Sequence, residues 1–206
     1  VGGMPASDLM VAKEVKSPNL EPMRLVARGP TGDSAAATKR TYRVADLSSL
    51  ESSLKPDSFH DASYDSTLEE CIREVLEQEA PILDKVLVDR IARAHGFKRS
   101  GRLIRERVLE LAERHYHFQP DPEPEHGHFV WLAADDPGRW NIYRVPEREE
   151  DVRFIEEIAP EEIRVAARSI KSDDITTDIA RTFGIRRLSA SARSRLLKVL
   201  GAGAGF

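Results

Sequence analysis

Between residues 66 and 131 the apolar residues change from a helical to a strand-like period, and this order constrains the fold most. Up to about residue 114 they recur every three or four positions, as on one face of a helix. Beyond it they alternate with polar residues, as in β-strands. Pro81 and Gly96 divide the first part, because proline interrupts a helix and glycine accepts a left-handed C-terminal cap. The sequence therefore predicts three helices and then a β-hairpin.

Each helix has its own signals. Ser66 and Glu69 fit a capping box at the start of the first helix. The second is expected over about 82–94, and the third runs from Ser100, as its N-cap, to about 114. The apolar residues assigned to the inner faces are Leu68, Ile72, Val75 and Leu76; Leu83, Val86, Leu87, Ile91 and Ala94; and Ile104, Val108, Leu111 and Ala112. Three helices followed by a hairpin is the order of a winged helix-turn-helix.

The hairpin is predicted from "HYHFQPDPEPEHGHFVWLA". Tyr116 and Phe118 in its first half alternate with polar residues, and Phe129 and Trp131 in its second half alternate with His128 and Val130, which predicts an aromatic face turned inward. Its tip, "PDPEPE", carries three acids that would repel phosphate. Short strands are also expected within 41–47 and 140–146.

The predicted fold is α+β and mainly α: a winged helix-turn-helix of three helices and a β-hairpin wing, then a small three-helix subdomain. Residues 1–40 form a flexible linker or tail, 41–146 the winged-helix-like domain and 147–206 the C-terminal helical subdomain. Helices in the last part are expected over about 160–171, 173–183 and 189–200. Because the chain starts with Val, we expect it to be an excerpt or a processed form, and part of something larger.

Residues 91–111 recur without a gap as residues 179–199. Eight of the 21 positions are identical, and both copies have the pattern helix, glycine-containing turn, helix. The repeat predicts a second helix-turn-helix-like segment. A helical hairpin with a glycine cap is also common, so convergence is the alternative.

The third helix carries the candidate nucleic-acid contacts. Basic residues lie at its N-terminal end on the outward face and acids at its C-terminal end, the reverse of what the helix dipole favours. A recognition helix presents its N-terminal residues to DNA. The candidates are Lys98, Arg99, Ser100, Arg102 and Arg105, with Arg186, Arg187 and Arg193 as secondary candidates in the second copy. The alternative is a solvated face with the pairs Arg102–Glu106 and Glu110–Arg114.

Other residues give little sign of chemistry. His115, His117, His126 and His128 fall in the hairpin, where His117 and His128 could stand opposite each other and hold a metal with His126. No carboxylate or cysteine completes a familiar spacing, so we expect no metal and no cofactor. Phosphate-loop, dinucleotide and hydrolase motifs are absent, and Asp84 and Asp89 suit surface charges, so no enzyme is expected.

Composition limits the function classes. A net charge of −4 argues against a protein that coats nucleic acid indiscriminately, but it permits a local basic patch. The single cysteine, Cys71, excludes an internal disulfide and favours the cytoplasm. No apolar run reaches the length of a membrane span, so no membrane partner is expected.

The stretch "FHDASYDSTLEE…EQEAPILDKVLVDRIARAHGFKRSGRLIRERVL" resembles an uncharacterised bacterial domain family. That family forms the C-terminal region of very large superfamily I helicase-like proteins, which often carry a restriction-endonuclease-like domain. The resemblance spans about residues 41–200 and implies a DNA-processing or defence context, with the helicase and nuclease domains of the parent protein as partners. The family offers no assigned catalytic residues.

Together these observations predict a non-catalytic module that helps a larger helicase or nuclease engage DNA through the N-terminal half of the third helix. The alternative is a protein-protein or intramolecular docking module with no nucleic-acid contact, using the acidic segment 147–162. The sequence leaves open the choice among DNA, RNA and protein, any sequence specificity, and the oligomeric state.

Overall fold

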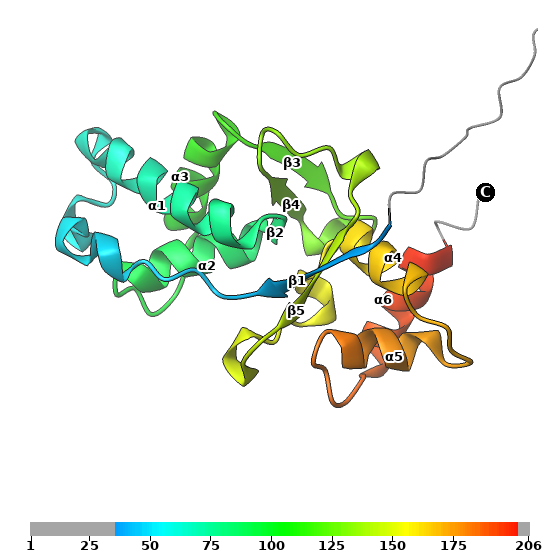
Figure 1. The fold of residues 1–206 in the computed structure, drawn as a ribbon. Coiled ribbons are helices and arrows are strands. Elements are labelled where there is room, and N and C mark those ends of the chain that lie inside the picture. The colour runs from blue at the N-terminus through cyan, green and yellow to red at the C-terminus, as the bar shows by residue number, and fades with distance from the viewer. Residues whose placement is uncertain (1–35, 202–206) are drawn as a thin grey trace, which may run out of the picture. The chain divides into compact units, whose positions relative to one another are not determined.

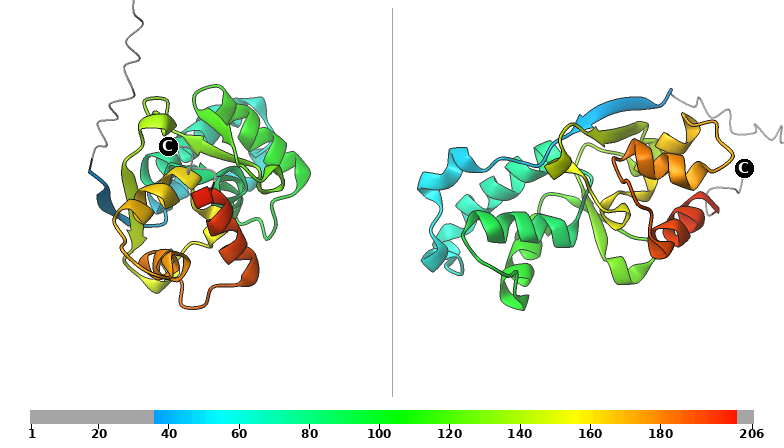
Figure 2. Two further views of the ribbon diagram at one scale, coloured as in Figure 1. Left: turned by 90° about the vertical axis from the view of Figure 1, so that its right-hand side faces the viewer. Right: turned by 90° about the horizontal axis from the view of Figure 1, so that it is seen from below.

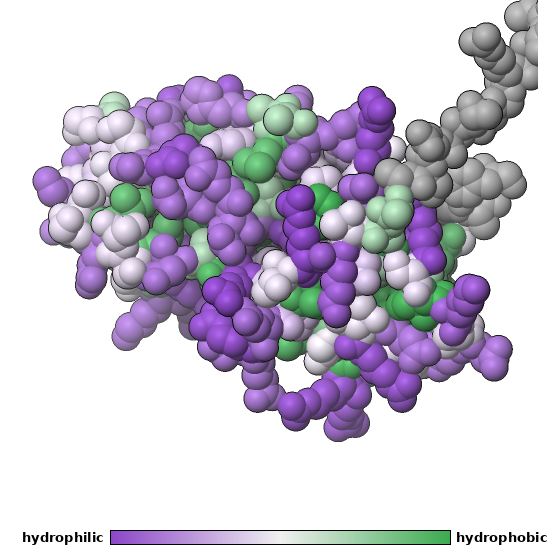
Figure 3. Space-filling model, in the orientation of Figure 1, coloured by the Kyte–Doolittle hydropathy of each residue, from purple (hydrophilic) through white to green (hydrophobic). Residues whose placement is uncertain are grey.

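The computed structural model describes residues 36–201. It is an α+β structure in which helices predominate (Figure 1). The tail predicted over residues 1–40 lies outside the described residues except at its end, where Thr38–Arg40 belong to strand β1 (Thr38–Tyr42). Hydrophilic residues cover most of the face drawn in Figure 3. No helix within 36–201 is long and apolar enough to cross a membrane.

The three predicted helices and the two strands of the hairpin occur in the predicted order, with a further short strand between the first two helices. Their bounds are α1 (Asp65–Glu79), β2 (Ile82–Leu83), α2 (Asp84–Ala94), α3 (Arg102–Glu113), β3 (His117–Pro120) and β4 (His128–Trp131). The sheet is antiparallel in the order β2-β4-β3. Every apolar residue assigned to an inner face is buried except Ala94, which is half-buried. The helical period therefore located this core correctly.

Two predicted helix starts are wrong. Helix α1 begins at Asp65, with Tyr64 in the cap position and no side-chain cap, so Ser66 lies inside the first turn. Helix α3 begins at Arg102 after Gly101, again without a side-chain cap. The Ser100 hydroxyl donates instead to the carboxylate of Asp89. The cap position falls on Gly101, so Ser100 stands one residue too early to cap this helix.

Strand β2 and the register of the hairpin were not foreseen. β2 has two residues, too few to show a period, and pairs with β4. In the hairpin, Phe118 lies opposite Val130 and Gln119 opposite Phe129. Directly opposed residues share a face, so Phe118 is on the face away from Phe129, and the prediction of one aromatic face is wrong. The alternation sets the phase within each strand, but the connection between the strands sets their register.

The C-terminal part contains the three predicted helices, α4 (Pro160–Arg168), α5 (Ile175–Thr182) and α6 (Ala190–Gly201). Strand β5 (Ile142–Pro146) precedes them and pairs in parallel with β1. In Figure 1 and the right-hand view of Figure 2, α4–α6 lie together on the side of β1 and β5 away from α1 and α2. They enclose a second apolar cluster that includes Ile155, Ile163, Ile179, Phe183, Leu196 and Val199. The predicted domain boundary at residue 147 remains a prediction.

A buried ionic network joins the two groups of helices. The Glu162 carboxylate on α4 is fully buried and accepts from Arg144 of β5 at 2.8 Å and from Arg153 at 2.7 Å. Arg144 also donates to the carbonyl oxygens of Glu79 at 2.7 Å and of Pro81 at 2.9 Å, at the end of α1. Burial would raise the pKa of Glu162, but the two guanidinium groups lower it to about 2. The carboxylate is therefore the ionised centre of this junction.

The sequence repeat has a structural counterpart in the same register. Helices α3 and α6 are both twelve residues long and start 88 positions apart. Gly96 and Gly184, at equivalent positions, have φ values of 77° and 79°. In each copy the glycine amide and the next amide donate to the last turn of the preceding helix, the pattern of a Schellman cap. Helices α2 and α3, and helices α5 and α6, thus form two helix–turn–helix units with the same kind of turn.

These two glycines offer a matched test of packing around the second turn. A Cβ at Gly96 would meet nothing within 4 Å, whereas one at Gly184 would lie 2.8 Å from Cγ of Pro146. Gly96→Ala is expected to lower the free energy of unfolding by about 1 kcal/mol, for the left-handed backbone alone. Gly184→Ala should cost roughly 1–3 kcal/mol more because of overpacking. Urea unfolding of both variants measures the difference, and equal losses would contradict the close packing at Gly184.

Candidate nucleic-acid interface

The turn between α2 and α3 presents the exposed cations. Lys98 and Arg99 are exposed, and neither forms an ion pair with any of residues 36–201. Arg102, in the first turn of α3, is 79% exposed and pairs with Glu106 at 2.8 Å. This pair is the i, i+4 contact considered as the alternative, and at an exposed site it is weak. The three cations therefore remain accessible at one end of α3.

Arg105 is placed differently from the other candidates. It is half-buried and donates at 3.0 Å to Asp84, a buried carboxylate at the start of α2. Asp84 also accepts from the backbone amide of His128 at 3.3 Å. The expectation that Asp84 is a surface charge is wrong, because its helix start faces the hairpin. Arg105 thus ties α3 to the start of α2, and Asp84 in turn ties that helix start to the hairpin.

The secondary candidates in the second copy also comprise one arginine held by a carboxylate and two that are exposed. Arg193 of α6 donates to Asp174 at 3.1 Å, at the N-cap of α5, and is the repeat equivalent of Arg105. Arg186 is 86% exposed, 3.6 Å from Glu149, and Arg187 is exposed without an ion pair inside the described range. In both copies, then, an arginine of the second helix reaches back to an acid at the start of the first. This shared pairing gives a structural reason for the identity of Arg105 and Arg193.

The start of α3 also lacks acidic residues. Helices α1, α2, α4 and α5 each have an acid in the first turn, whereas α3 has none. The amides and dipole at the N-terminus of a helix favour a negative charge there. With Lys98, Arg99 and Arg102 beside it, this end of α3 is suited to an anion. Further along the same helix the exposed residues include Glu106, Glu110 and Glu113.

A residue that sequence patterns did not single out holds the turn in place. His95 is buried directly before Gly96, and one ring nitrogen contacts the carbonyl oxygen of Ile91 at 2.8 Å. The other ring nitrogen lies 3.0 Å from the hydroxyl of Tyr64. Burial lowers the pKa of His95, which favours the neutral ring. His95 is thus a positioning residue, because it fixes the chain three residues before Lys98, the first of the exposed cations.

The acidic tip of the hairpin does not face solvent as a free acidic loop. Arg195 of α6 is buried and donates to both oxygens of Asp121 at 2.7 Å. Lys198, one turn further along α6, pairs with Glu123. Two of the three acids at the tip are therefore neutralised within the chain. The hairpin is docked on α6, which gives its acidic tip a structural role.

The four histidines of the hairpin region lie in different surroundings. His117 lies opposite Trp131 and His128 opposite Pro120, so the face-to-face arrangement of His117 and His128 does not form. His126 instead gathers with Asp121 and Glu123, a set whose atoms are close enough for a metal ion. The Arg195 guanidinium already lies among them, 3.0 Å from Nδ1 of His126. The positive charge beside these three side chains is thus that of Arg195.

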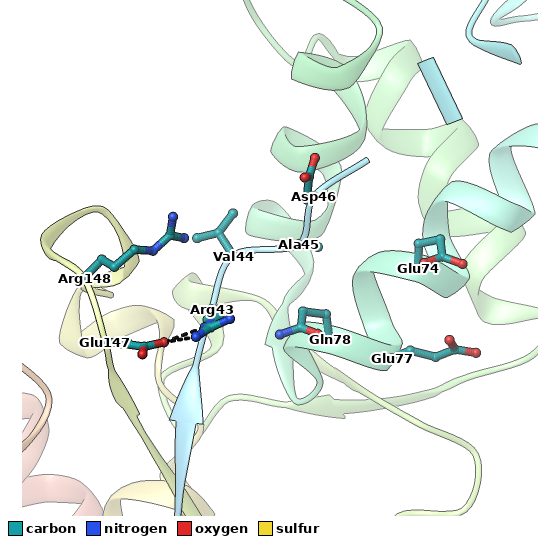
Figure 4. Close-up of a pocket in the computed structure, with 9 residues that line it drawn as sticks. All are labelled: Arg43, Val44, Ala45, Asp46, Glu74, Glu77, Gln78, Glu147 and Arg148. Atoms are coloured by element: carbon teal, nitrogen blue, oxygen red, sulfur yellow. Dashed lines mark hydrogen bonds and ion pairs between the residues drawn. The ribbon is translucent and has the colours of Figure 1, made fainter. Parts of the chain in front are cut away.

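A polar pocket of about 850 Å³ lies between the end of β1 and helix α1 (Figure 4). Its charged residues are largely paired: Arg43 with Glu147, and Arg148 with Asp151 at 2.8 Å. In Figure 4 the carboxylate of Glu77 points away from Arg43 and Arg148. The residues that line this pocket include no serine, threonine, cysteine or histidine.

A family described as "Protein of unknown function (DUF3320)" has a sequence model that matches residues 57–106. This is about a quarter of the chain, and it runs from the loop before α1 into the first half of α3. The candidate cations from Lys98 to Arg105 lie within the matched segment. No curated protein and no solved structure matches the chain.

Proposed function

We propose that residues 65–131 form a winged-helix unit that contacts DNA phosphates through the turn before α3 and the first turn of that helix. The observation that carries the proposal is the accessible cluster of Lys98, Arg99 and Arg102 at an acid-free helix start. The element order and the sheet order β2-β4-β3 support a winged helix. The module is non-catalytic and serves a larger helicase or nuclease-type protein.

The mode of contact follows from the positions of the charges. The hairpin tip is occupied by α6, so the wing makes no phosphate contact. The acids in the second half of α3 would repel a phosphate chain, so only the start of the helix approaches the duplex. Arg105 stays with Asp84 and positions the helix rather than binding DNA. Such a small set of contacts predicts weak, strongly salt-dependent binding that is mainly to the backbone.

The double variant Lys98→Ala/Arg99→Ala tests this proposal. Each lost phosphate contact makes the plot of log affinity against log salt less steep by about one unit, so the slope should fall by about two. Fluorescence anisotropy with a labelled duplex of mixed sequence, from low to moderate salt, measures both affinity and slope. Both residues are exposed, and the variant should keep the unfolding curve of the wild-type protein.

Arg186→Ala/Arg187→Ala is the matched control. It removes the same charge from the equivalent turn of the second copy, 88 positions later. We expect a much smaller change in affinity, because Arg186 lies 3.6 Å from Glu149, whereas neither Lys98 nor Arg99 forms an ion pair within the described structure. Equal losses would show a general charge effect and would contradict a defined contact. Absence of wild-type binding at any salt concentration would overturn the proposal.

A second candidate function is intramolecular docking without nucleic acid. The contact between Asp121 and Arg195 favours it, since the hairpin already holds the C-terminal helices. The acidic segment 147–162 gives it less support than its composition suggests. Glu147, Asp151 and Glu162 are each paired with arginine, so they do not form a free acidic surface.

A further inference from the structure

A mainly apolar groove lies beside the second helix–turn–helix unit, away from the candidate DNA contacts. It has a volume of about 650 Å³ and lies between residues 152–156 and residues 184–192. We call it the 154 groove. Its apolar lining consists of Val152, Phe154, Ile155, Ile185 and Ala192. Phe154 is 72% exposed, the most exposed large apolar side chain among residues 36–201.

The backbone on both sides of Phe154 is firmly held. Arg153 is buried and bound to Glu162, and Ile155 is buried in the C-terminal core. The amide of Phe154 itself donates to the Glu157 carboxylate at 3.1 Å. Because its neighbours cannot move without breaking the core, Phe154 cannot turn inward. The fold thus keeps an aromatic side chain in water, and pre-organised exposed aromatic residues are typical anchors of protein interfaces.

Positive charge borders the groove. Arg187 is exposed without an ion pair within 36–201, and Arg186 lies 3.6 Å from Glu149 with both side chains more than 80% exposed. Helix α6, which starts at this border, has no acid in its first turn. Ser189 caps it by accepting from the amide of Ala192 at 3.1 Å. Arginines and an acid-free helix start favour a partner with carboxylates.

We infer that the 154 groove docks a short acidic segment of a partner protein, with one or two aliphatic or aromatic side chains packed against Phe154 and flanking carboxylates paired with Arg186 and Arg187. A single-stranded nucleic acid fits these features less well. The groove has one aromatic ring, that of Phe154, rather than a series on which successive bases could stack. The apolar lining offers contact to methyl groups instead.

Selection from a random twelve-residue phage-displayed peptide library against the full chain tests the inference. The enriched peptides should combine apolar residues with Asp or Glu. Their binding, measured by fluorescence polarisation with synthetic copies, should weaken at least tenfold for Phe154→Ser and for Arg187→Glu. Both positions are exposed, so the variants should fold. Leu103→Ser and Lys171→Glu are the controls, since they make the same kinds of change at exposed sites elsewhere.

The outcomes separate clearly. Acidic-apolar peptides that respond to the two groove variants and not to the controls support the inference. Enrichment of basic peptides, no enrichment, or affinities unchanged by Phe154→Ser would overturn it. An oligonucleotide of twelve thymidines that binds the wild-type chain and loses binding on Phe154→Ser would also overturn it, in favour of a nucleic-acid site. None of these results depends on whether α3 binds DNA.

Discussion

Replacing Glu162 by glutamine is expected to lower the free energy of unfolding by about 3–5 kcal/mol. The substitution leaves Arg144 and Arg153 buried at the junction of the two groups of helices without a counter-charge. A buried guanidinium has lost its hydration, and without a nearby carboxylate no ionic attraction compensates for that loss. Urea unfolding at neutral pH measures the loss.

The same carboxylate predicts a dependence of stability on pH. Its pKa in the folded chain is about 2, against 4.5 in the unfolded chain. A group whose pKa is lower when folded contributes stability above its unfolded pKa, and that contribution disappears as the pH falls through the folded pKa. Glu162 should therefore account for a loss of about 3 kcal/mol between pH 5 and pH 2. In Glu162→Gln this part of the pH dependence should be missing.

Glu161→Gln is the control for both measurements. Glu161 is the neighbouring residue of α4, and its pairs with Arg164 at 3.2 Å and with Gln119 at 3.0 Å are only partly buried. It should cost much less than Glu162→Gln and should keep the acid-induced loss of stability. Equal effects of the two variants would contradict a central role for the buried network.

Replacing Arg195 by methionine is the second large effect that we expect. Asp121 is fully buried and would lose both of its 2.7 Å hydrogen bonds from the guanidinium. Burial raises the pKa of Asp121, but the hydrogen bond and charge of Arg195 and the amide of Glu123 together outweigh this and leave the pKa lowered, so the acid is ionised at neutral pH. An uncompensated buried charge costs about 3–5 kcal/mol. The hairpin should also separate from α6, which hydrogen exchange at residues 121–127 can report.

A double-mutant cycle isolates the pair. Asp121→Asn/Arg195→Met should recover most of the loss, since neither side chain is then an unpaired charge. Lys198→Met is the control: it removes an exposed cation from the same face of α6 and should change stability little. If the double variant were as unstable as Arg195→Met alone, packing by the arginine rather than its charge would hold the hairpin.

Local patterns predicted the helices and their buried faces well. The period of Leu68, Ile72 and Val75, or of Ile104 and Val108, depends only on neighbours in the chain, so the sequence contains it. Partners far apart in sequence were not predictable in this way. Strand β2 pairs with β4 across the whole unit, and Arg195 meets Asp121 from another group of helices. No local signal specifies such contacts.

In the candidate site, too, local features could be predicted from the sequence and contacts between distant residues could not. Exposure of Arg102 could be predicted from the helical wheel, because it places this residue opposite the apolar face. Lys98 and Arg99 lie in the turn before α3, where the wheel does not apply. The pairing of Arg105 could not be predicted, since it depends on Asp84, 21 residues earlier, being buried against the hairpin. One sequence feature could have indicated this pairing: an acid at the start of one helix and an arginine in the next occur in both copies, as Asp84 with Arg105 and as Asp174 with Arg193.

The most direct test of the proposed DNA contact is the map of backbone amide shifts when the ¹⁵N-labelled chain is titrated with a short duplex. The account predicts the largest shifts at residues 97–103, with little change at the hairpin tip, 121–127, which α6 occupies, and little at 185–191 in the second copy. Shifts concentrated at the tip or in the second copy, or no shifts at low salt, would contradict it.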